Sequence, residues 1–219
     1  MKRGGIAATF CDLDETLYPG LSIKDASSWF LQKGYLSRWN YLKIAWWIML
    51  KKLGRLDDEA AFAAGVGLLA GWQEIRFKKA IGEAYAAVLR PKLRPAIYKQ
   101  MVTWKKRGPV VLVTETLAPI AETFARDLGA DAVIATQLDV QNGRLTGKLV
   151  GPVMRGEAKL SALRAFAERE KIDLRASIGV GGQIEDTPLI VSCGQGIVIN
   201  PNNALACVAR QAGWKILRV

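Results

Sequence analysis

Two aspartates separated by one residue follow a short apolar run near the start of the chain, in the segment TFCDLDETLY (residues 9–18). Side chains two residues apart in an extended segment point the same way, so the carboxylates of Asp12 and Asp14 converge where the run ends. Such close like charges need a cation or a shared proton, and carboxylate oxygens suit Mg²⁺, which also binds phosphate. One carboxylate can then attack phosphorus while the other transfers protons. The simpler alternative is that one of the aspartates caps a helix.

The composition excludes several other kinds of site. The 219 residues include no histidine, which excludes Ser-His-Asp triads, Cys-His dyads and histidine-ligated zinc. The cysteines at positions 11, 193 and 207 are scattered, so we predict neither a zinc knuckle nor a disulfide framework, and a reducing compartment is favoured. Lys and Arg outnumber Asp and Glu by 31 to 20, which favours an anionic partner without choosing among small phosphates, nucleic acid and an acidic membrane.

The elements that must position the two aspartates alternate along the chain. Short apolar runs alternate with amphipathic stretches, which is typical of a parallel α/β sheet. We predict strands at about residues 6–11, 109–114, 131–136, 176–180 and 196–199, and helices at about 117–128, 156–171 and 202–213. Within residues 137–150, Asn142-Gly143 is a strong signal for a two-residue hairpin turn.

Residues 21–93 interrupt this alternation. They contain no convincing strand, and we predict helices at roughly 22–33, 36–53, 57–70 and 72–90. The sequence therefore predicts a core domain of residues 1–20 and 94–219 with a helical insertion, residues 21–93, between its first two strands. Ligands of open α/β sheets bind at the carboxyl edge of the strands, and we expect the insertion to lie over that edge as a lid.

The insertion is basic and rich in tryptophan. Residues 21–95 contain 13 Lys or Arg and 6 Asp or Glu, and five of the seven tryptophans, Trp29, Trp39, Trp46, Trp47 and Trp72. The segment LSRWNYLKIAWWIMLKKLGR (36–55) resembles a helix at a membrane interface, with basic residues around an aromatic centre. Alternatively, Trp46, Trp47 and their neighbours form the core of a small helical bundle flanked by solvated lysines. We favour the bundle, because an interfacial helix needs a polar face and this run is apolar all round.

The order of the motifs resembles the haloacid dehalogenase superfamily. An apolar strand leads into DLDET, VVLVT follows at residues 110–114, an isolated lysine lies in GEAK (156–159), and an acidic loop precedes an apolar helix. The insertion after the first motif is similar to the helical C1 cap of the phosphoserine-phosphatase-like branch. The resemblance covers nearly the entire chain. It implies an α/β fold, a Rossmann-like parallel sheet core with an inserted α-helical cap domain.

The resemblance also implies catalytic roles for four residues. Asp12 corresponds to the nucleophile that forms an aspartyl-phosphate. Asp14 corresponds to the residue that protonates the leaving alcohol and then activates water, while its main-chain carbonyl helps to hold Mg²⁺. Thr114 corresponds to a donor to a phosphoryl oxygen, and Lys159 to the cation that neutralises the charge of the phosphoryl group. Phosphoryl transfer depends on such positioning and electrostatic roles.

The fourth motif departs from the family pattern. Family members carry G-D-x-x-x-D, and SIGVGGQIEDTPLI (177–190) aligns Gly181, Gly182 and Asp186 with it, so a glycine replaces the first aspartate. We expect Asp186 to complete the Mg²⁺ site with Asp12 and Asp14. A hard-cation site with fewer carboxylates binds more weakly. Three interpretations are open. Asp186 or Glu185 reaches the metal and preserves some activity, the protein is a pseudo-phosphatase that binds phosphorylated ligands, or the substrate or metal differs from that of the family. We favour retained activity.

The expected substrate also departs from the family. Phosphoserine phosphatases grip the amino acid with a glutamate and an arginine, and our alignment places Leu21 or Ser22 and Gly65 at these positions. We therefore expect a larger or lipid-linked phosphate ester and not phosphoserine. The candidate substrate-binding residues are Thr16, Ser22 and Glu115.

The expected partners follow from the same features. They are a phosphorylated small molecule or lipid head group, and an anionic membrane in peripheral contact with the insertion. No nucleic-acid motif accompanies the positive charge, so we expect no specific nucleic-acid partner. The N-terminus reaches Asp12 too soon for a signal peptide. The expected location is the cytoplasm, with contact at the inner face of the membrane.

Overall fold

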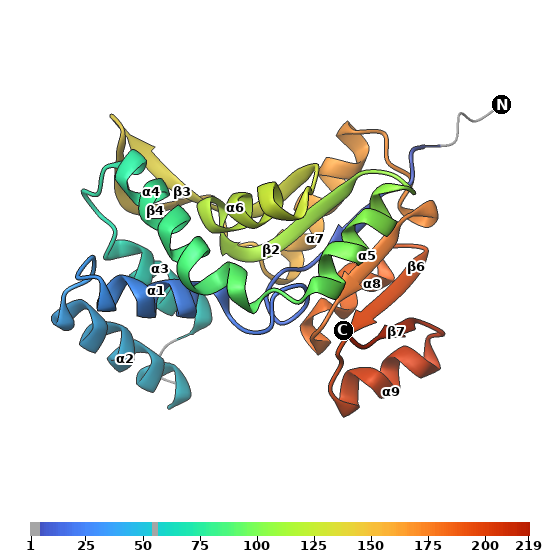
Figure 1. The fold of residues 1–219 in the computed structure, drawn as a ribbon, viewed down its shortest axis with the longest axis horizontal. Coiled ribbons are helices and arrows are strands. Elements are labelled where there is room, and N and C mark those ends of the chain that lie inside the picture. The colour runs from blue at the N-terminus through green and yellow to red at the C-terminus, as the bar shows by residue number, and fades with distance from the viewer. Residues whose placement is uncertain (1–4, 54–56) are drawn as a thin grey trace.

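The computed structural model describes residues 5–53 and 57–219, and these form a seven-stranded sheet in the order β4-β3-β2-β1-β5-β6-β7. Every neighbouring pair is parallel except β3–β4. The strands are β1 (Thr9–Cys11), β2 (Val110–Leu117), β3 (Ala132–Gln141), β4 (Arg144–Val150), β5 (Ile178–Gly181), β6 (Gln195–Ile199) and β7 (Lys215–Leu217), as Figure 1 shows. The predicted α/β fold with a mainly parallel sheet is confirmed.

The strand predictions missed one element and underestimated another. The sequence did not predict β7, which has three residues and pairs with β6 at the edge of the sheet. Strand β3 continues through the region assigned to the hairpin, and β4 returns antiparallel to it. Asn142 and Gly143 form the turn with φ of 49° and 70°, the left-handed values that this two-residue turn requires. The predicted hairpin is therefore confirmed.

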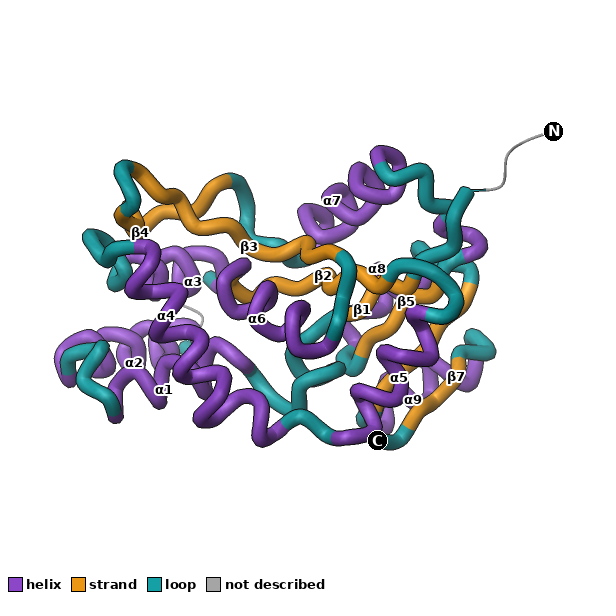
Figure 2. Tube along the Cα trace, turned by 45° about the horizontal axis from the view of Figure 1, so that its top comes forward, coloured by secondary structure: helices purple, strands orange, loops and turns teal. Residues whose placement is uncertain are grey.

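Helices cover both faces of the sheet, because successive strand residues point to opposite faces. On one face, Phe10 and Val111 pack with α7 (Gly156–Arg169), α8 (Thr187–Val191) and α9 (Asn203–Gln211). On the other face, Cys11 and Leu112 pack with α5 (Pro95–Lys105) and α6 (Ala118–Leu128). Figure 2 shows the two helical layers around the strands. This double coverage explains why the central strands β1, β2 and β5 are buried at nearly every position.

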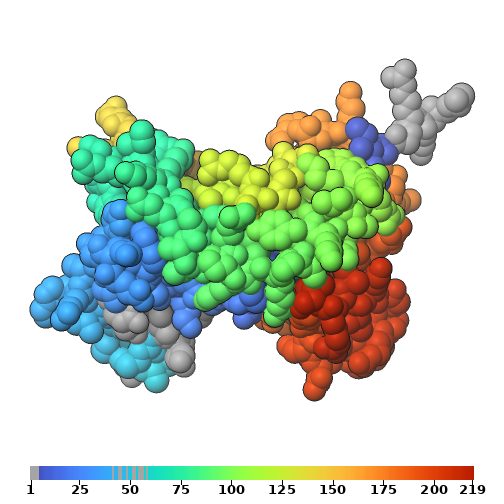
Figure 3. Space-filling view, viewed as in Figure 1, coloured from blue at the N-terminus to red at the C-terminus, as the bar shows by residue number. Residues whose placement is uncertain are grey.

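The helical insertion, residues 21–93, lies between β1 and β2 in the chain. It contains α1 (Ser22–Gln32), α2 (Arg38–Lys52), α3 (Asp58–Gly67) and α4 (Glu74–Ala84), then a π-helical turn (Tyr85–Leu89) and a 3₁₀ turn (Arg90–Lys92). The predicted helices are confirmed, although residues 54–56 lie outside the described residues and the domain boundaries stay a prediction. In Figure 3 the first helices (blue) form a lobe that is separated by a notch from the C-terminal helix (red). No described helix is long and apolar enough to cross a membrane.

The insertion has an aromatic core that lies outside the segment 36–55. Neighbouring rings lie 5.7–6.2 Å apart, in a cluster of Trp29, Phe30, Tyr35, Trp72 and Phe77. The bundle interpretation is wrong for Trp46, which is exposed like Trp39, while Trp47 is half-buried. Helix α2 is apolar on more sides than the insertion can cover, so one of its faces is left in solvent.

Main-chain hydrogen bonds attach the insertion to the β3–β4 hairpin. The Gly71 amide donates to the Leu145 carbonyl and the Leu145 amide donates to the Trp72 carbonyl, both at 2.8 Å. The Glu74 amide donates to the Gly143 carbonyl at 2.9 Å. The hairpin therefore holds α3 and α4 at the end of the sheet, as Figure 2 shows.

Asp127 of α6 attaches the end of the insertion to the core. Its carboxylate accepts hydrogen bonds from the hydroxyls of Tyr85 and Tyr98 and lies 3.3 Å from the guanidinium of Arg90. Burial raises the pKa of Asp127, but the hydrogen bonds from Tyr98 and Tyr85 and the charge of Arg90 lower it more, so the net shift is downward.

The change Asp127→Asn should lower the free energy of unfolding by about 1–3 kcal/mol at pH 7, because a charged acceptor is lost. A carboxyl group with a lowered pKa stabilises the fold above its unfolded pKa of about 3.9, and this contribution is lost as the pH falls through the folded pKa. The deficit should therefore shrink in acid. Urea unfolding at pH 7 and below pH 4 measures it, with exposed Glu168→Gln as the matched control. An equal deficit at both pH values would contradict the role of this charge.

Candidate active site

The order of the sheet brings three sequence motifs to one edge. Strand β1 lies between β2 and β5. The sheet continues on one side of β1 through β2 and β3, and on the other side through β5, β6 and β7. Ligands of α/β sheets bind at such a switch point, at the carboxyl ends of the strands. Asp12 follows β1, and its amide donates to the carbonyl of Val180 in β5 at 3.0 Å. The first and fourth motifs are therefore in direct contact.

Lys159 joins these motifs through a buried ion pair with each. Its ammonium Nζ lies 2.7 Å from Oδ1 of Asp12 and 3.3 Å from Oδ1 of Asp186. The hydroxyl of Thr16 donates to Oδ2 of Asp12 at 3.1 Å. Burial lowers the pKa of Lys159, but the two carboxylates raise it more, so the lysine remains charged. Residues that are far apart in the sequence thus form one buried cluster.

The carboxylates of this region outnumber its buried cation. Burial raises the pKa of Asp12 to about 7, and the charges of Asp186 and Asp14 add to this, while Lys159 opposes it. Burial also raises the pKa of Asp14 to about 6, against a hydrogen bond from the amide of Ser22 at 2.8 Å. Three carboxylates with one lysine leave negative charge uncompensated, and a further cation would stabilise it.

Asp186 is held by the main chain of its own loop. Its Oδ2 accepts hydrogen bonds from the amides of Gly182 and Gln183, both at 3.0 Å. Together with the contact to Lys159, these bonds use much of its acceptor capacity. The bonds fit a carboxylate that fixes the loop after β5, and a role for Asp186 as a metal ligand stays a prediction.

Gly182 packs against the main chain of the DLDET loop. A Cβ atom at this position would lie 2.0 Å from the carbonyl oxygen of Glu15 and 2.9 Å from Oγ1 of Thr16. Glu15 has a φ of 56°, in the left-handed region that residues with side chains seldom adopt. The space that any side chain at position 182 would need is therefore occupied by backbone.

The second motif forms a bulge at the end of β2. Val113 pairs with Ile134 and Leu117 pairs with Thr136, so β2 has two more residues than β3 between these pairs. Bulges near active sites redirect side chains. Within this bulge, the hydroxyl of Thr114 is buried and accepts a hydrogen bond from the amide of Thr116 at 3.2 Å.

All three candidate substrate-binding residues have protein partners, and that of Thr16 is the carboxylate of Asp12. The carboxylate of Glu115 forms two hydrogen bonds with the guanidinium of Arg155, at 2.7 and 2.8 Å. Ser22 is completely buried, and its hydroxyl lies 3.2 Å from that of Thr116. Sequence reasoning missed Arg155, although it precedes Lys159 by four residues, one turn away along the same motif. The substrate-binding roles of Thr16, Ser22 and Glu115 stay predictions.

The predicted residues therefore fall into two groups. Asp12, Thr16, Lys159 and Asp186 contact one another directly. Asp14 is attached to Ser22 in α1, which lies beside the bulge of β2. Within residues 5–53 and 57–219, no three acidic or cysteine side chains form a cluster that could hold a metal ion.

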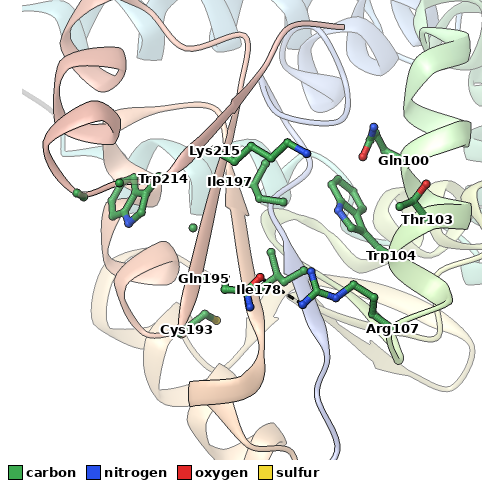
Figure 4. Close-up of a pocket in the computed structure, with 14 residues that line it drawn as sticks. Gln100, Thr103, Trp104, Arg107, Ile178, Cys193, Gln195, Ile197, Trp214 and Lys215 are labelled. Atoms are coloured by element: carbon green, nitrogen blue, oxygen red, sulfur yellow. Dashed lines mark hydrogen bonds between the residues drawn. The ribbon is translucent and has the colours of Figure 1, made fainter.

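A cavity of about 380 Å³ lies at the opposite edge of the sheet. Its lining includes Ile178, Gln195 and Lys215, the first residues of β5, β6 and β7. Figure 4 shows that Trp104 in α5 and Arg107, just after α5, face these strand ends. The guanidinium of Arg107 donates a hydrogen bond of 3.3 Å to the side-chain carbonyl of Gln195. Among the described residues, no carboxylate lines this cavity, which is separate from the cluster around Asp12.

The geometry of the cluster agrees with a comparison against known families. The model of the haloacid dehalogenase-like hydrolases matches residues 9–190, which span the strand before Asp12 to the helix after Asp186. The chain belongs to the haloacid dehalogenase-like hydrolases.

Relatives of this hydrolase include proteins with phosphatase names. It is 27% identical over 216 residues to phosphoserine phosphatase SerB1 of Mycobacterium tuberculosis, a match that covers 96% of this chain and 70% of the relative. It is 30% identical over 219 residues to the inhibition of morphological differentiation protein of Streptomyces azureus, which covers 96% and 77%. A crystal structure of a protein of unknown function from Bordetella pertussis Tohama I has the same fold, with a TM-score of 0.88, 23% identity and coverage of 97% and 98%.

Substitution of Gly182 in this hydrolase should destabilise it. Gly182→Ala forces a Cβ into the carbonyl of Glu15, and such overpacking costs about 1–3 kcal/mol. Gly182→Asp adds a carboxylate and meets the same backbone, so it should be destabilised as well. Thermal unfolding measures both.

The matched control is Gly82→Ala in α4, where a Cβ would contact nothing within 4 Å. It should be neutral or stabilising by about 0.5–1 kcal/mol, because alanine favours a helix over glycine. Equal effects at positions 182 and 82 would show that the contact with Glu15 is not a constraint.

Proposed function

We propose that the protein is a phosphomonoesterase that forms an aspartyl-phosphate on Asp12. The observation that carries this proposal is the contact of 2.7 Å between Asp12 and Lys159 at the end of the central strand. An ammonium group at this distance stabilises the carboxylate as an ionised nucleophile and can offset charge on an incoming phosphate. The membership in a hydrolase family and the similarity to SerB1 support the same chemistry.

The reaction proceeds in two displacements. A carboxylate oxygen of Asp12 attacks phosphorus, the bond to the ester oxygen breaks, and Asp14 gives its proton to the departing alkoxide. Water then attacks the same phosphorus, Asp14 takes its proton, and the acyl-phosphate bond breaks to release inorganic phosphate and restore Asp12. The amide of Ser22 orients Asp14 through its bond to Oδ1. Thr114 donates to a phosphoryl oxygen.

The residues fit Mg²⁺ as an open site. The excess of buried carboxylates over Lys159 favours a cation, and Mg²⁺ binds through one or two carboxylates together with water and substrate phosphate. The Asp12 carboxylate and the Asp14 main-chain carbonyl would hold it. When bound, the ion supplies positive charge that neutralises the phosphoryl oxygens.

The proposed substrate is a phosphate ester larger than phosphoserine, including lipid-linked esters. The position of the family's glutamate falls on Leu21 or the buried Ser22, and that of its arginine falls on Gly65, so no charged side chain stands there for an amino acid head group. The excess of basic residues in the insertion favours an anionic substrate.

The second candidate is a pseudo-phosphatase that binds phosphorylated ligands without turnover. The contact of Gly182 with the Glu15 carbonyl favours it, because no carboxylate can occupy that position without movement of the backbone. Both candidates use Lys159 to bind phosphate, and they differ in whether a covalent intermediate forms.

Hydrolysis of p-nitrophenyl phosphate with and without Mg²⁺ separates the two candidates. The native protein should turn over with Mg²⁺, and Asp12→Asn should lower kcat by about 10³-fold or more, since loss of a nucleophile removes the covalent route. Exposed Glu168→Gln, at the other end of α7, should change kcat less than twofold, in line with other surface changes. An acid-quenched sample should contain a phosphorylated peptide that includes Asp12.

An inactive native protein that still binds inorganic phosphate in calorimetry would support the pseudo-phosphatase. Activity that survives in Asp12→Asn would reject both the nucleophile and the proposed mechanism.

A further inference from the structure

Helix α2 exposes a row of large apolar side chains along one face. They recur every three or four residues, which places them on one side of an α-helix. The exposed fractions are 76% for Trp39, 56% for Leu42, 56% for Trp46, 42% for Met49 and 60% for Leu53, which directly follows the helix. These residues are called the α2 stripe.

The α2 stripe differs from the other exposed apolar side chains of the described residues. Those side chains, such as Ile75, Val102 and Val191, are separated along the chain, and scattered exposure of this kind is normal. A contiguous apolar row is uncommon on a soluble surface and marks an interaction site. On the same helix, Trp47 and Leu50 are half-buried. The apolar residues of the helix thus extend beyond the exposed row, which explains why the sequence showed no clean polar side.

Positive charge surrounds the stripe. Residues 36–56 contain five Lys or Arg and no Asp or Glu. Arg38 and Lys43 are exposed, and at 3.6 residues per turn they flank the stripe on opposite sides. In the part of the chain that the structure describes, neither forms an ion pair. The surface therefore combines tryptophan, aliphatic side chains and unpaired cations.

We propose that the α2 stripe binds the surface of a bilayer that contains anionic phospholipid. Tryptophan favours the interface between head groups and acyl chains, and flanking cations are attracted to anionic head groups. A second copy of the chain fits less well, because the two facing segments would each bring five positive charges and no acidic residue. Figure 1 shows α2 at the outer end of the insertion, where a flat surface can approach it.

This docking goes beyond the proposed function and does not depend on it, because binding to vesicles requires no turnover. Loss of activity in Asp12→Asn would leave it intact. Conversely, a protein that fails to bind vesicles could still be an active phosphatase.

Co-sedimentation with vesicles tests the proposal. Vesicles of equal parts phosphatidylglycerol and phosphatidylcholine should bind the protein at low salt, and vesicles of phosphatidylcholine alone should bind it much less. Trp39→Ser/Trp46→Ser should lower the partition coefficient roughly tenfold or more, because insertion depends on the apolar side chains. Arg38→Gln/Lys43→Gln should also weaken binding, and high salt should weaken it further.

Matched controls distinguish binding through the α2 stripe from nonspecific binding through other exposed apolar side chains or through net charge. Ile75→Ser/Val102→Ser removes equally exposed apolar side chains elsewhere, and Lys99→Gln/Lys148→Gln removes the same charge from exposed positions. Neither control should change binding more than twofold, an ordinary surface effect. Because the stripe is exposed, its variants should keep the native melting temperature.

Three results would overturn the proposal. Native protein that does not sediment with anionic vesicles is the first, and stripe variants that bind as well as the native protein are the second. The third is a dimer in light scattering that the stripe variant converts to monomer without any vesicle binding, which would assign the stripe to a second copy.

Discussion

The buried contact of Lys159 with Asp12 and Asp186 is the interaction on which the rest of the site depends. The three residues come from α7, the end of β1 and the loop after β5. Removal of one partner from such a buried group leaves an uncompensated charge, at a cost of about 3–5 kcal/mol. The contact therefore requires a sheet in which β1 lies next to β5, and it requires α7 to pack where Lys159 reaches both aspartates. The ion pairs of Lys159 and the order of the strands therefore both require β1 and β5 to be neighbours.

The three carboxylates of the site differ in the hydrogen-bond donors that surround them. Two main-chain amides bind Asp186, so its charge is used to fix the loop after β5. Asp12 and Asp14 have fewer donors and raised pKa values, which fits the roles in phosphorus and proton chemistry proposed for them. The backbone of Glu15 fills the place beside Gly182. The loop after β5 and the loop after β1 are therefore in close contact at Gly182.

The helical insertion is connected to the catalytic residues by more than the chain itself. The amide of Ser22, the first residue of α1, holds Asp14, while the β3–β4 hairpin and Asp127 attach the other helices. Movement of the insertion would therefore alter the position of Asp14. A surface contact through the α2 stripe would act on the same helical insertion that holds Asp14, the proposed proton donor.

The sequence by itself determined the features that depend on local pattern: the central strands, the insertion, the Asn142-Gly143 turn and the pair Asp12 and Asp14. These follow from side-chain periodicity and backbone preference, which operate over a few residues. Only the tertiary structure decided that Arg155 pairs with Glu115, that Glu15 closes the space beside Gly182, and that Trp46 lies in solvent. Such contacts depend on how distant segments pack, and a helix that is apolar all round does not reveal which face its neighbours cover.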